Sequence, residues 1–496
     1  MKKIYLFVAA ALLTLTGCDL DINENPNYPS DTDVSDAMVF PAAENAIADV
    51  FGDAAFNYGG FFAQFFEQRP ESNQYNNLCE YNIQEATDIF TRPYAIIYSR
   101  ALEDLDIICN RSTNPANVYA AKVMRAIAFQ FLVDNTSDTP YTEALQGTTN
   151  AQPKYDDGET VYKGVLDELD KAEANLTSES MTFNDPVFNK DITQWKGLAN
   201  ALRLRMYLRM IDGGIDADSY TAKVKELIAK NEFFTGDAQW DVYSDADGQW
   251  NPWYDSYHTL GAANHVAAYP IVSYYLANND PRISFAIKKN TKNNAYVGQI
   301  PGAKTMYQSW TGSQWKNVEV SDIDYTKANH MAIPYFTQSE LQFLIAECQL
   351  RFNNDAAAAK TAYEKAVKLD FEWRGIDGAD DFLAQDGVNF DKQKTTEDKL
   401  DLIYMQKWAA LFYRDHMEAW SEIRRTDVPK TSPLTAKEVY TNPDKYTPGD
   451  MIIPALNTFG NNQLIKRLPY SSTSRRLNPN TPPVKAISDR VFWDAK

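Results

Sequence analysis

Apolar residues recur at intervals of three and four along most of the chain, the spacing of an amphipathic helix. In the segment 195–210 one such face carries Trp195, Leu198, Ala199, Leu202, Met206 and Met210, whereas Arg203, Arg205 and Arg209 fall largely off it. The same period runs through 118–133, 161–176, 341–352 and 402–424. It fails between 232 and 332, where Gly, Asn, Asp, Pro and aromatic residues mix as in loops with short strands. The pattern predicts a mostly α fold, helical pairs at 118–176, 195–230 and 341–425, and a loop-rich insertion at about 232–332.

One predicted helical pair carries a repeat-like spacing. Ala359, Tyr363, Ala366 and Leu369 follow the second half of a tetratricopeptide repeat, in which small residues let two helices approach closely. The segment 341–352 would be the first helix of the pair, although its own positions match the repeat poorly. A plain helical hairpin therefore remains an alternative for this pair.

The amino terminus has the form of a secretory signal. Lys2 and Lys3 precede an apolar run at 4–15 that is too short to span a bilayer. The run ends in Leu-Thr-Gly-Cys, which matches the bacterial lipobox, so residues 1–17 are expected to be removed and Cys18 to be acylated. An ordinary signal peptide with an incidental cysteine is the alternative. The polar, proline-broken segment 18–35 would then be a flexible tether to the membrane.

Charge and cysteine content exclude several classes of protein. The 48 Lys and Arg residues against 67 Asp and Glu residues give a net charge of −19, which opposes binding to nucleic acid. Apart from Cys18, the chain has Cys79, Cys109 and Cys348, an odd number without C-x-x-C spacing. A disulfide framework and a cysteine-rich zinc site are therefore not expected.

Motifs for catalysis are mostly missing. The chain has no H-E-x-x-H, G-x-S-x-G, P-loop or G-x-G-x-x-G motif, and of its four histidines His416 lies in a strongly helical segment that favours a structural role. The acidic stretch 243–251 has some features of a calcium loop, but tyrosines occupy its first and last ligand positions, so a solvated turn is the alternative. A carboxylate pair for glycoside hydrolysis leaves no sequence signature and stays open. We expect no catalytic residue, cofactor or metal.

Aromatic residues beside amides and carboxylates are the best candidates for ligand binding. Sugars pack C–H faces on flat rings and need polar partners for their hydroxyls. Three segments offer this mixture: 240–258, 307–315 and the stretch around Tyr75. The candidate ligand-binding residues are Trp240, Trp250, Trp253, Tyr254, Tyr257, Trp310, Trp315 and Tyr75. For each ring, burial in the packing of its own loop is the alternative.

Several blocks in one order resemble the SusD/RagB-like family. They are DNTSDTPYTEALQG at 134–147, YDDGETVY at 155–162, WKGLANALRLRM at 195–206, SELQFLIAECQLRF at 339–352, ALFYRDHMEAWSEIRRTDVP at 410–429 and RLPYSSTSRRLNPN at 467–480. The chain looks most like the SusD-like branch described as starch-binding and associated with the outer membrane. Cys348 and the pair Ser471 and Ser472 depart from the usual residues of the family.

The resemblance implies a single SusD-like helical domain over 36–496, built as a superhelix of tetratricopeptide-like pairs with an irregular ligand-binding half. It also implies a lipoprotein on the outer face of the outer membrane that covers a SusC-like, TonB-dependent transporter as a lid. The expected ligand is an oligosaccharide. Capture of peptides, as in some relatives, is the main alternative; a surface glycoside hydrolase or a scaffold is a further one.

Overall fold

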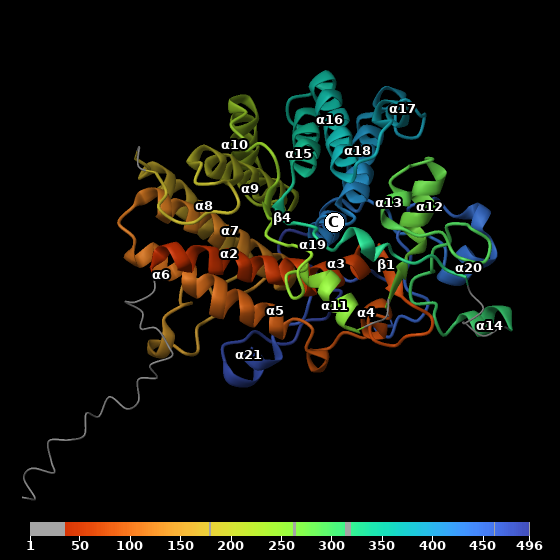
Figure 1. Cartoon of the computed structure of the whole chain (residues 1–496), viewed down its shortest axis with the longest axis horizontal. Helices are drawn as coiled ribbons and strands as arrows, with labels where there is room; N and C mark the ends of the chain where they lie inside the picture. Colours follow the sequence, from red (N-terminus) through yellow and green to blue (C-terminus); the bar gives the residue numbers. More distant parts are fainter. Residues whose placement is uncertain (1–34, 178–179, 261–263, 313–318, 461, 496) are drawn as a thin grey trace, which may run out of the picture.

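Helices form most of the fold in the computed structural model, which describes residues 35–177, 180–260, 264–312, 319–460 and 462–495. The first helical layer contains α2 (Asp36–Gly52), α3 (Ala54–Phe62), α5 (Thr91–Ile96), the π-helical turn η3 (Ile97–Leu102), α6 (Glu103–Arg111) and α7 (Pro115–Thr136). Figure 1 shows α2 lying along α5, α6 and α7. This layer supports the remaining helical pairs.

Four helical pairs follow along the chain and confirm the predicted fold class. They are α7 with α8 (Gly158–Ala174), α9 (Ile192–Asp212) with α10 (Ala217–Lys230), α15 (Gln338–Arg351) with α16 (Ala356–Arg374), and α18 (Thr396–Leu411) with α19 (His416–Thr426). In Figure 1 the pairs stand next to one another, with α9, α10, α15 and α16 side by side. The described part of the chain is thus mostly helical, as its periodicity predicts.

The helix starts follow from short polar residues that accept a hydrogen bond from the first free N–H groups. Seven caps of this kind are Asn114, Asp157, Asp191, Thr337, Asp355, Thr395 and Asp415.

The close packing of α15 against α16 follows from small residues. Ala359 and Ala366 are fully buried, and the hydroxyl of Ser339 on α15 donates to the carbonyl of Ala366 at 2.9 Å. The repeat-like spacing of α16 therefore does bring two helices into close contact.

The arginines of α9 correct the amphipathic prediction, because this helix is buried on all sides. Arg203, Arg205 and Arg209 are at most 6% exposed, although they fall outside the apolar face. Arg209 pairs with Asp134 of α7 at 2.5 Å and with Glu418 of α19 at 2.6 Å. Buried charges persist only when they are paired and hydrogen-bonded. Arg209 thus links α9 to α7 and α19 inside the fold.

The carboxyl-terminal segment fastens the end of α7. Arg424 donates to the carbonyl of Asp134 at 2.6 Å, Leu468 N–H donates to that of Asn135 at 2.8 Å, and Arg467 donates to that of Thr136. The last carbonyls of a helix have no partner within the helix, and cations near them are favourable. The end of α7 is therefore completed by residues more than 280 positions further along the chain.

The segment 232–332 contains short elements, in line with its lack of helical period. They are β2 (Ala238–Trp240), α11 (Pro252–Leu260), β3 (His265–Ala267), α12 (Tyr269–Ala277), α13 (Ile283–Ala286), α14 (Tyr307–Thr311) and η6 (Tyr325–Lys327). β3 pairs antiparallel with β1 (Phe66–Gln68), Phe66 facing Ala267, and β2 pairs with β4 (Ile333–Phe336). These two-stranded sheets attach the segment to the helical framework.

The remaining elements are short. They are α4 (Asn76–Cys79), η2 (Glu85–Thr87), η4 (Gly147–Thr149), α17 (Ala379–Leu383), η7 (Phe390–Lys392), α20 (Ala436–Thr441), η8 (Pro443–Lys445) and α21 (Ser472–Leu477). Within the described ranges, no helix is both long and apolar enough to cross a membrane. The expected signal peptide, the acylated Cys18 and most of the tether lie outside the described residues. Cys79, Cys109 and Cys348 are free thiols.

Candidate functional site

The helix α11 organises the richest aromatic segment of the chain. The side chain of the fully buried Asn251 accepts from the backbone N–H of Trp253 at 2.9 Å and donates to the carbonyl of Met331 at 2.7 Å. An asparagine in this position caps the first turn of a helix. It fixes both the start of α11 and the direction in which its rings point.

A partly exposed aromatic surface is formed at α11 by Trp250, which precedes the helix, and by Tyr254 and His258 on it. Tyr254 and His258 are four apart and share one helical face, and the Trp250 ring folds back over both. The Trp250 ring centre lies 5.9 Å from that of Tyr254 and 4.4 Å from that of His258. We call these three residues the α11 aromatic face. His258 was not among the predicted residues, although its spacing from Tyr254 could have identified it.

A polar pocket of about 210 Å³ adjoins this helix. Asp255 and Ser256 of α11 line it together with Asp49 and Asp53 of α2 and its carboxyl end, and with Arg92 of α5. Burial raises the pKa of the Asp53 carboxyl, and the nearby Arg92 guanidinium lowers it in part. The pocket offers carboxylates, a hydroxyl and a guanidinium, which are suitable partners for sugar hydroxyl groups. Asp49, Asp53 and Arg92 could not be placed near α11 from the sequence, since they come from distant segments.

Trp253 and Trp240 occupy the core and not the α11 aromatic face. Trp253 is 1% exposed and packs against Phe56, with ring centres 4.8 Å apart, and against Tyr325 at 4.5 Å. Trp240 is 6% exposed on the short strand β2. Neither ring offers a free face to a ligand in this structure, which corrects their assignment as ligand-binding residues. In α11 a single step from Trp253 to Tyr254 crosses from the core to the surface.

Tyr75 is half-buried and linked to the same core. Its ring stacks on His265 at 4.8 Å, and His265 lies 5.9 Å from Trp253. Burial of the Tyr75 side chain raises its pKa to about 12. Lys304 donates to Ser72 and Asn73 and so anchors the loop before Tyr75. The structure thus brings Tyr75 and Trp253 together, but through buried rings.

Trp310 belongs to a separate groove of about 470 Å³ between α14 and α20. Its ring centre lies 5.6 Å from that of Tyr307 and 5.6 Å from that of Tyr440. Tyr440 is 39% exposed and was not predicted, because it lies 130 positions away in the sequence. Trp315 lies outside the described residues, and the side chain of Tyr257 is not described.

The acidic stretch at 243–251 contacts the segment at 329–330 through Asp245. Asp245 accepts from His330 and, at 2.8 Å, from Asn329. Over the described ranges, no group of three or more His, Cys, Asp or Glu side chains is placed to hold a metal ion.

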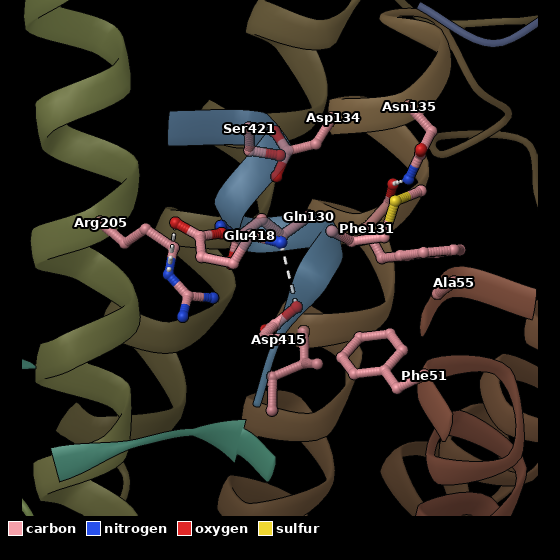
Figure 2. Close-up of a pocket in the computed structure, with 12 residues that line it drawn as sticks. Phe51, Ala55, Gln130, Phe131, Asp134, Asn135, Arg205, Asp415, Glu418 and Ser421 are labelled. Atoms are coloured by element: carbon pink, nitrogen blue, oxygen red, sulfur yellow. Dashed lines mark hydrogen bonds and ion pairs between the residues drawn. The ribbon is translucent and has the colours of Figure 1, made fainter. Parts of the chain in front are cut away.

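A much smaller cavity, of about 40 Å³, lies inside the helical framework among the buried charges (Figure 2). Arg205 and Glu418 face one another across it at 3.4 Å, and Asp415 accepts from the Glu418 N–H at 3.0 Å. Burial and the neighbouring Glu418 raise the pKa of Asp415 to about 7. A water molecule needs roughly 10–15 Å³ of such volume. The cavity therefore has room for water but not for a sugar ring.

Comparisons with known proteins place this architecture in a family. The family model described as "Starch-binding associating with outer membrane", SusD-like, matches residues 26–454. A SusD homolog from Bacteroides uniformis has a TM-score of 0.72 at 19% identity, covering 92% of this chain and 99% of its own. A chitin-binding protein gives 0.72 at 21% identity, with 93% and 100% covered. A SusD homolog from Bacteroides ovatus gives 0.70 at 22%, with 92% and 99% covered. No curated protein matches the chain.

The protein is therefore a mostly helical member of a class that combines stacked helical pairs with a loop-rich, aromatic half. It belongs to the SusD-like family, which is described as starch-binding and associated with the outer membrane. The solved structures, all below 25% identity here, support the fold.

Proposed function

We propose that this protein captures oligosaccharides at the cell surface, without catalysis, and that it does so at the α11 aromatic face. The observation that carries the proposal is the cluster of partly exposed rings Trp250, Tyr254 and His258 at α11, a helix whose Asp255 and Ser256 line a pocket of carboxylates, a hydroxyl and a guanidinium. Sugar rings would stack on Trp250 and Tyr254 while their hydroxyls bond to Asp53, Asp255 and Ser256. The chitin-binding neighbour and the starch-binding family description support this class of ligand.

The proposed cellular role follows from the family. We infer that the mature protein is anchored by acylated Cys18 on the outer face of the outer membrane and covers a SusC-like, TonB-dependent transporter. The polar segment 18–35 would allow the domain to move on its anchor while the captured oligosaccharide is delivered. The Trp310 groove and Tyr75 are further candidate contacts for the same ligand.

Binding by the lipid-free protein, residues 19–496, tests the proposal directly. The protein is titrated calorimetrically with maltoheptaose, chitohexaose and a mixed peptide pool, and incubated with the same sugars to detect hydrolysis. We expect a sugar to bind with micromolar to millimolar affinity and not to be cleaved. The affinity should depend little on salt, because neutral ligands offer no charge to screen. The double variant Trp250→Ala/Tyr254→Ala should lose most of this binding. Binding of peptides alone, or sugar cleavage, would contradict the proposal.

A control separates the α11 aromatic face from the second groove. Trp310→Ala removes the ring at the groove between α14 and α20 and leaves Trp250 unchanged. If Trp310→Ala abolishes binding while the double variant binds normally, the site lies at that groove instead. Co-purification of the full-length lipoprotein with a transporter encoded beside it tests the proposed delivery role.

A further inference from the structure

A groove of about 360 Å³ lies on the opposite side of α5 from the pocket beside α11. It is bounded by α5 and η3, by the segment 140–153 and by α21, and in Figure 1 α5 lies between α11 and α21. Among the described residues that line this groove, none carries a charge. In a chain with a net charge of −19, an uncharged groove favours a neutral ligand. We call it the α21 groove.

Two tyrosine rings form the wall of the α21 groove on the side of α5. Tyr94 and Tyr98 are one turn apart, with ring centres separated by 4.6 Å. The Tyr98 hydroxyl lies 2.7 Å from that of Thr139, and the Tyr94 hydroxyl lies 3.4 Å from that of Tyr155. These contacts fix the rings from behind. Ser99, Ser474 and Asn478 add uncharged polar groups at the edge, which together with flat rings suit a sugar.

The backbone around the α21 groove is unusual at two places. Tyr98 and Ser99 belong to the π-helical turn η3, a rare conformation that often occurs at functional sites. Leu145 lines the groove with a φ of 62°, in the left-handed region that a leucine rarely adopts. Such strained residues cluster at ligand sites, where the surrounding structure holds them. Leu477, 61% exposed on α21, completes an apolar rim.

The helix α5 separates the pocket beside α11 from the α21 groove and contributes residues to both. Arg92, Pro93 and Ile96 line the pocket beside α11, whereas Tyr94 and Tyr98 line the α21 groove. An α-helix with its side chains is about 10 Å across, so a ligand that occupies both sides must be longer than a few sugar units. We propose that the α21 groove is a second subsite for a neutral glycan chain that crosses α5 from the α11 aromatic face. This inference rests on the proposed function of that face.

Chain length tests this inference. The lipid-free protein is titrated with maltotriose and maltoheptaose, and in parallel with chitotriose and chitohexaose. Two linked contacts bind more tightly than either alone, so we expect the longer member of one series to bind at least tenfold more tightly than its trimer. Ala95→Arg places a long charged side chain at the exposed edge of the α21 groove without breaking α5. It should remove the advantage of the longer sugar and leave the trimer affinity unchanged.

A matched control is Ala222→Arg, which makes the same exposed change on α10, away from both sites. It should keep the full advantage of the longer sugar, and circular dichroism should show all variants folded. Equal affinity of short and long sugars in the wild type, or an unaltered advantage in Ala95→Arg, would overturn the subsite while the proposed function stands. Absence of sugar binding in the wild type would overturn both. If Trp250→Ala/Tyr254→Ala binds normally but Ala95→Arg does not, the α21 groove is the site and the proposed face is not.

Discussion

Substitutions at neighbouring positions of α11 should separate stability from binding. Trp253 is 1% exposed and is surrounded by Phe56, Phe66 and Tyr325, so truncation to alanine leaves a large cavity. Removing a buried tryptophan costs about 3–5 kcal/mol of the free energy of unfolding. Its indole N–H has no hydrogen-bond partner, so the loss arises from packing. Trp253→Phe keeps most of that packing and should cost clearly less than Trp253→Ala.

Trp250→Ala is the partner experiment. Trp250 lies half-exposed on the α11 aromatic face, so we expect a loss of stability within about 0.5 kcal/mol, typical of surface substitutions. A stacked ring contributes roughly 0.5–1.5 kcal/mol, which corresponds to about a twofold to tenfold loss of sugar affinity. Urea unfolding followed by circular dichroism measures the first quantity, and calorimetric titration with maltoheptaose and chitohexaose the second. The assignment of inner and outer rings would be refuted if Trp250→Ala lowered the free energy of unfolding without changing sugar affinity while Trp253→Ala left the free energy of unfolding unchanged. Trp250 would then be the packed ring and Trp253 would not.

Three further predictions concern the framework and the anchor. The pKa of Asp415 is raised to about 7 in the folded protein, so the folded state holds this proton more tightly than the unfolded chain does. The free energy of unfolding of the wild type should therefore fall as the pH rises from about 4 to 7, by at most about 4 kcal/mol. Asp415→Asn keeps the cap on Glu418 and should flatten this slope in urea unfolding at several pH values. Arg209→Met removes the guanidinium that Asp134 and Glu418 share in the core and should cost about 3–5 kcal/mol, measured by the same unfolding; a loss below 1 kcal/mol would contradict the role of the network. Cys18→Ala should yield a folded protein that takes up no palmitate and washes from the membrane fraction, whereas retention in cells without the transporter would argue against a lipid anchor.

The helical part of the fold could be predicted because its signals are local. Apolar spacing located the helices, capping residues such as Asp157 and Thr395 start them, and Ala359 and Ala366 indicated a close helical pair. The burial of Arg209 could not be predicted in this way. Periodicity assumes that charged residues face water, but here the charge is matched by acids from other helices.

The proposed site lies in a segment that the sequence singles out, but its individual residues could not be told apart from the sequence. Aromatic density pointed to 240–258, yet it could not distinguish Trp250 from Trp253, which lie on different sides of the same chain segment. The four-residue spacing of Tyr254 and His258 on α11 indicates their shared face, whereas Trp250 precedes the helix and its position follows from the fold. Asp53 and Arg92 carry no such signal, because only the packing of α2 against both α5 and α11 brings them there.

The fastening of α7 by the carboxyl-terminal segment has a consequence for the order in which the fold is completed. α7 lies early in the chain, but Asp134 receives the Trp493 indole N–H at 2.8 Å only when the last residues arrive. Amino-terminal parts of a chain generally fold first, so the end of α7 keeps open carbonyls until the carboxyl-terminal residues are in place. Completion of the fold thus depends on the last residues of the chain. A chain that ends before them would remain unfinished at one of its earliest helices.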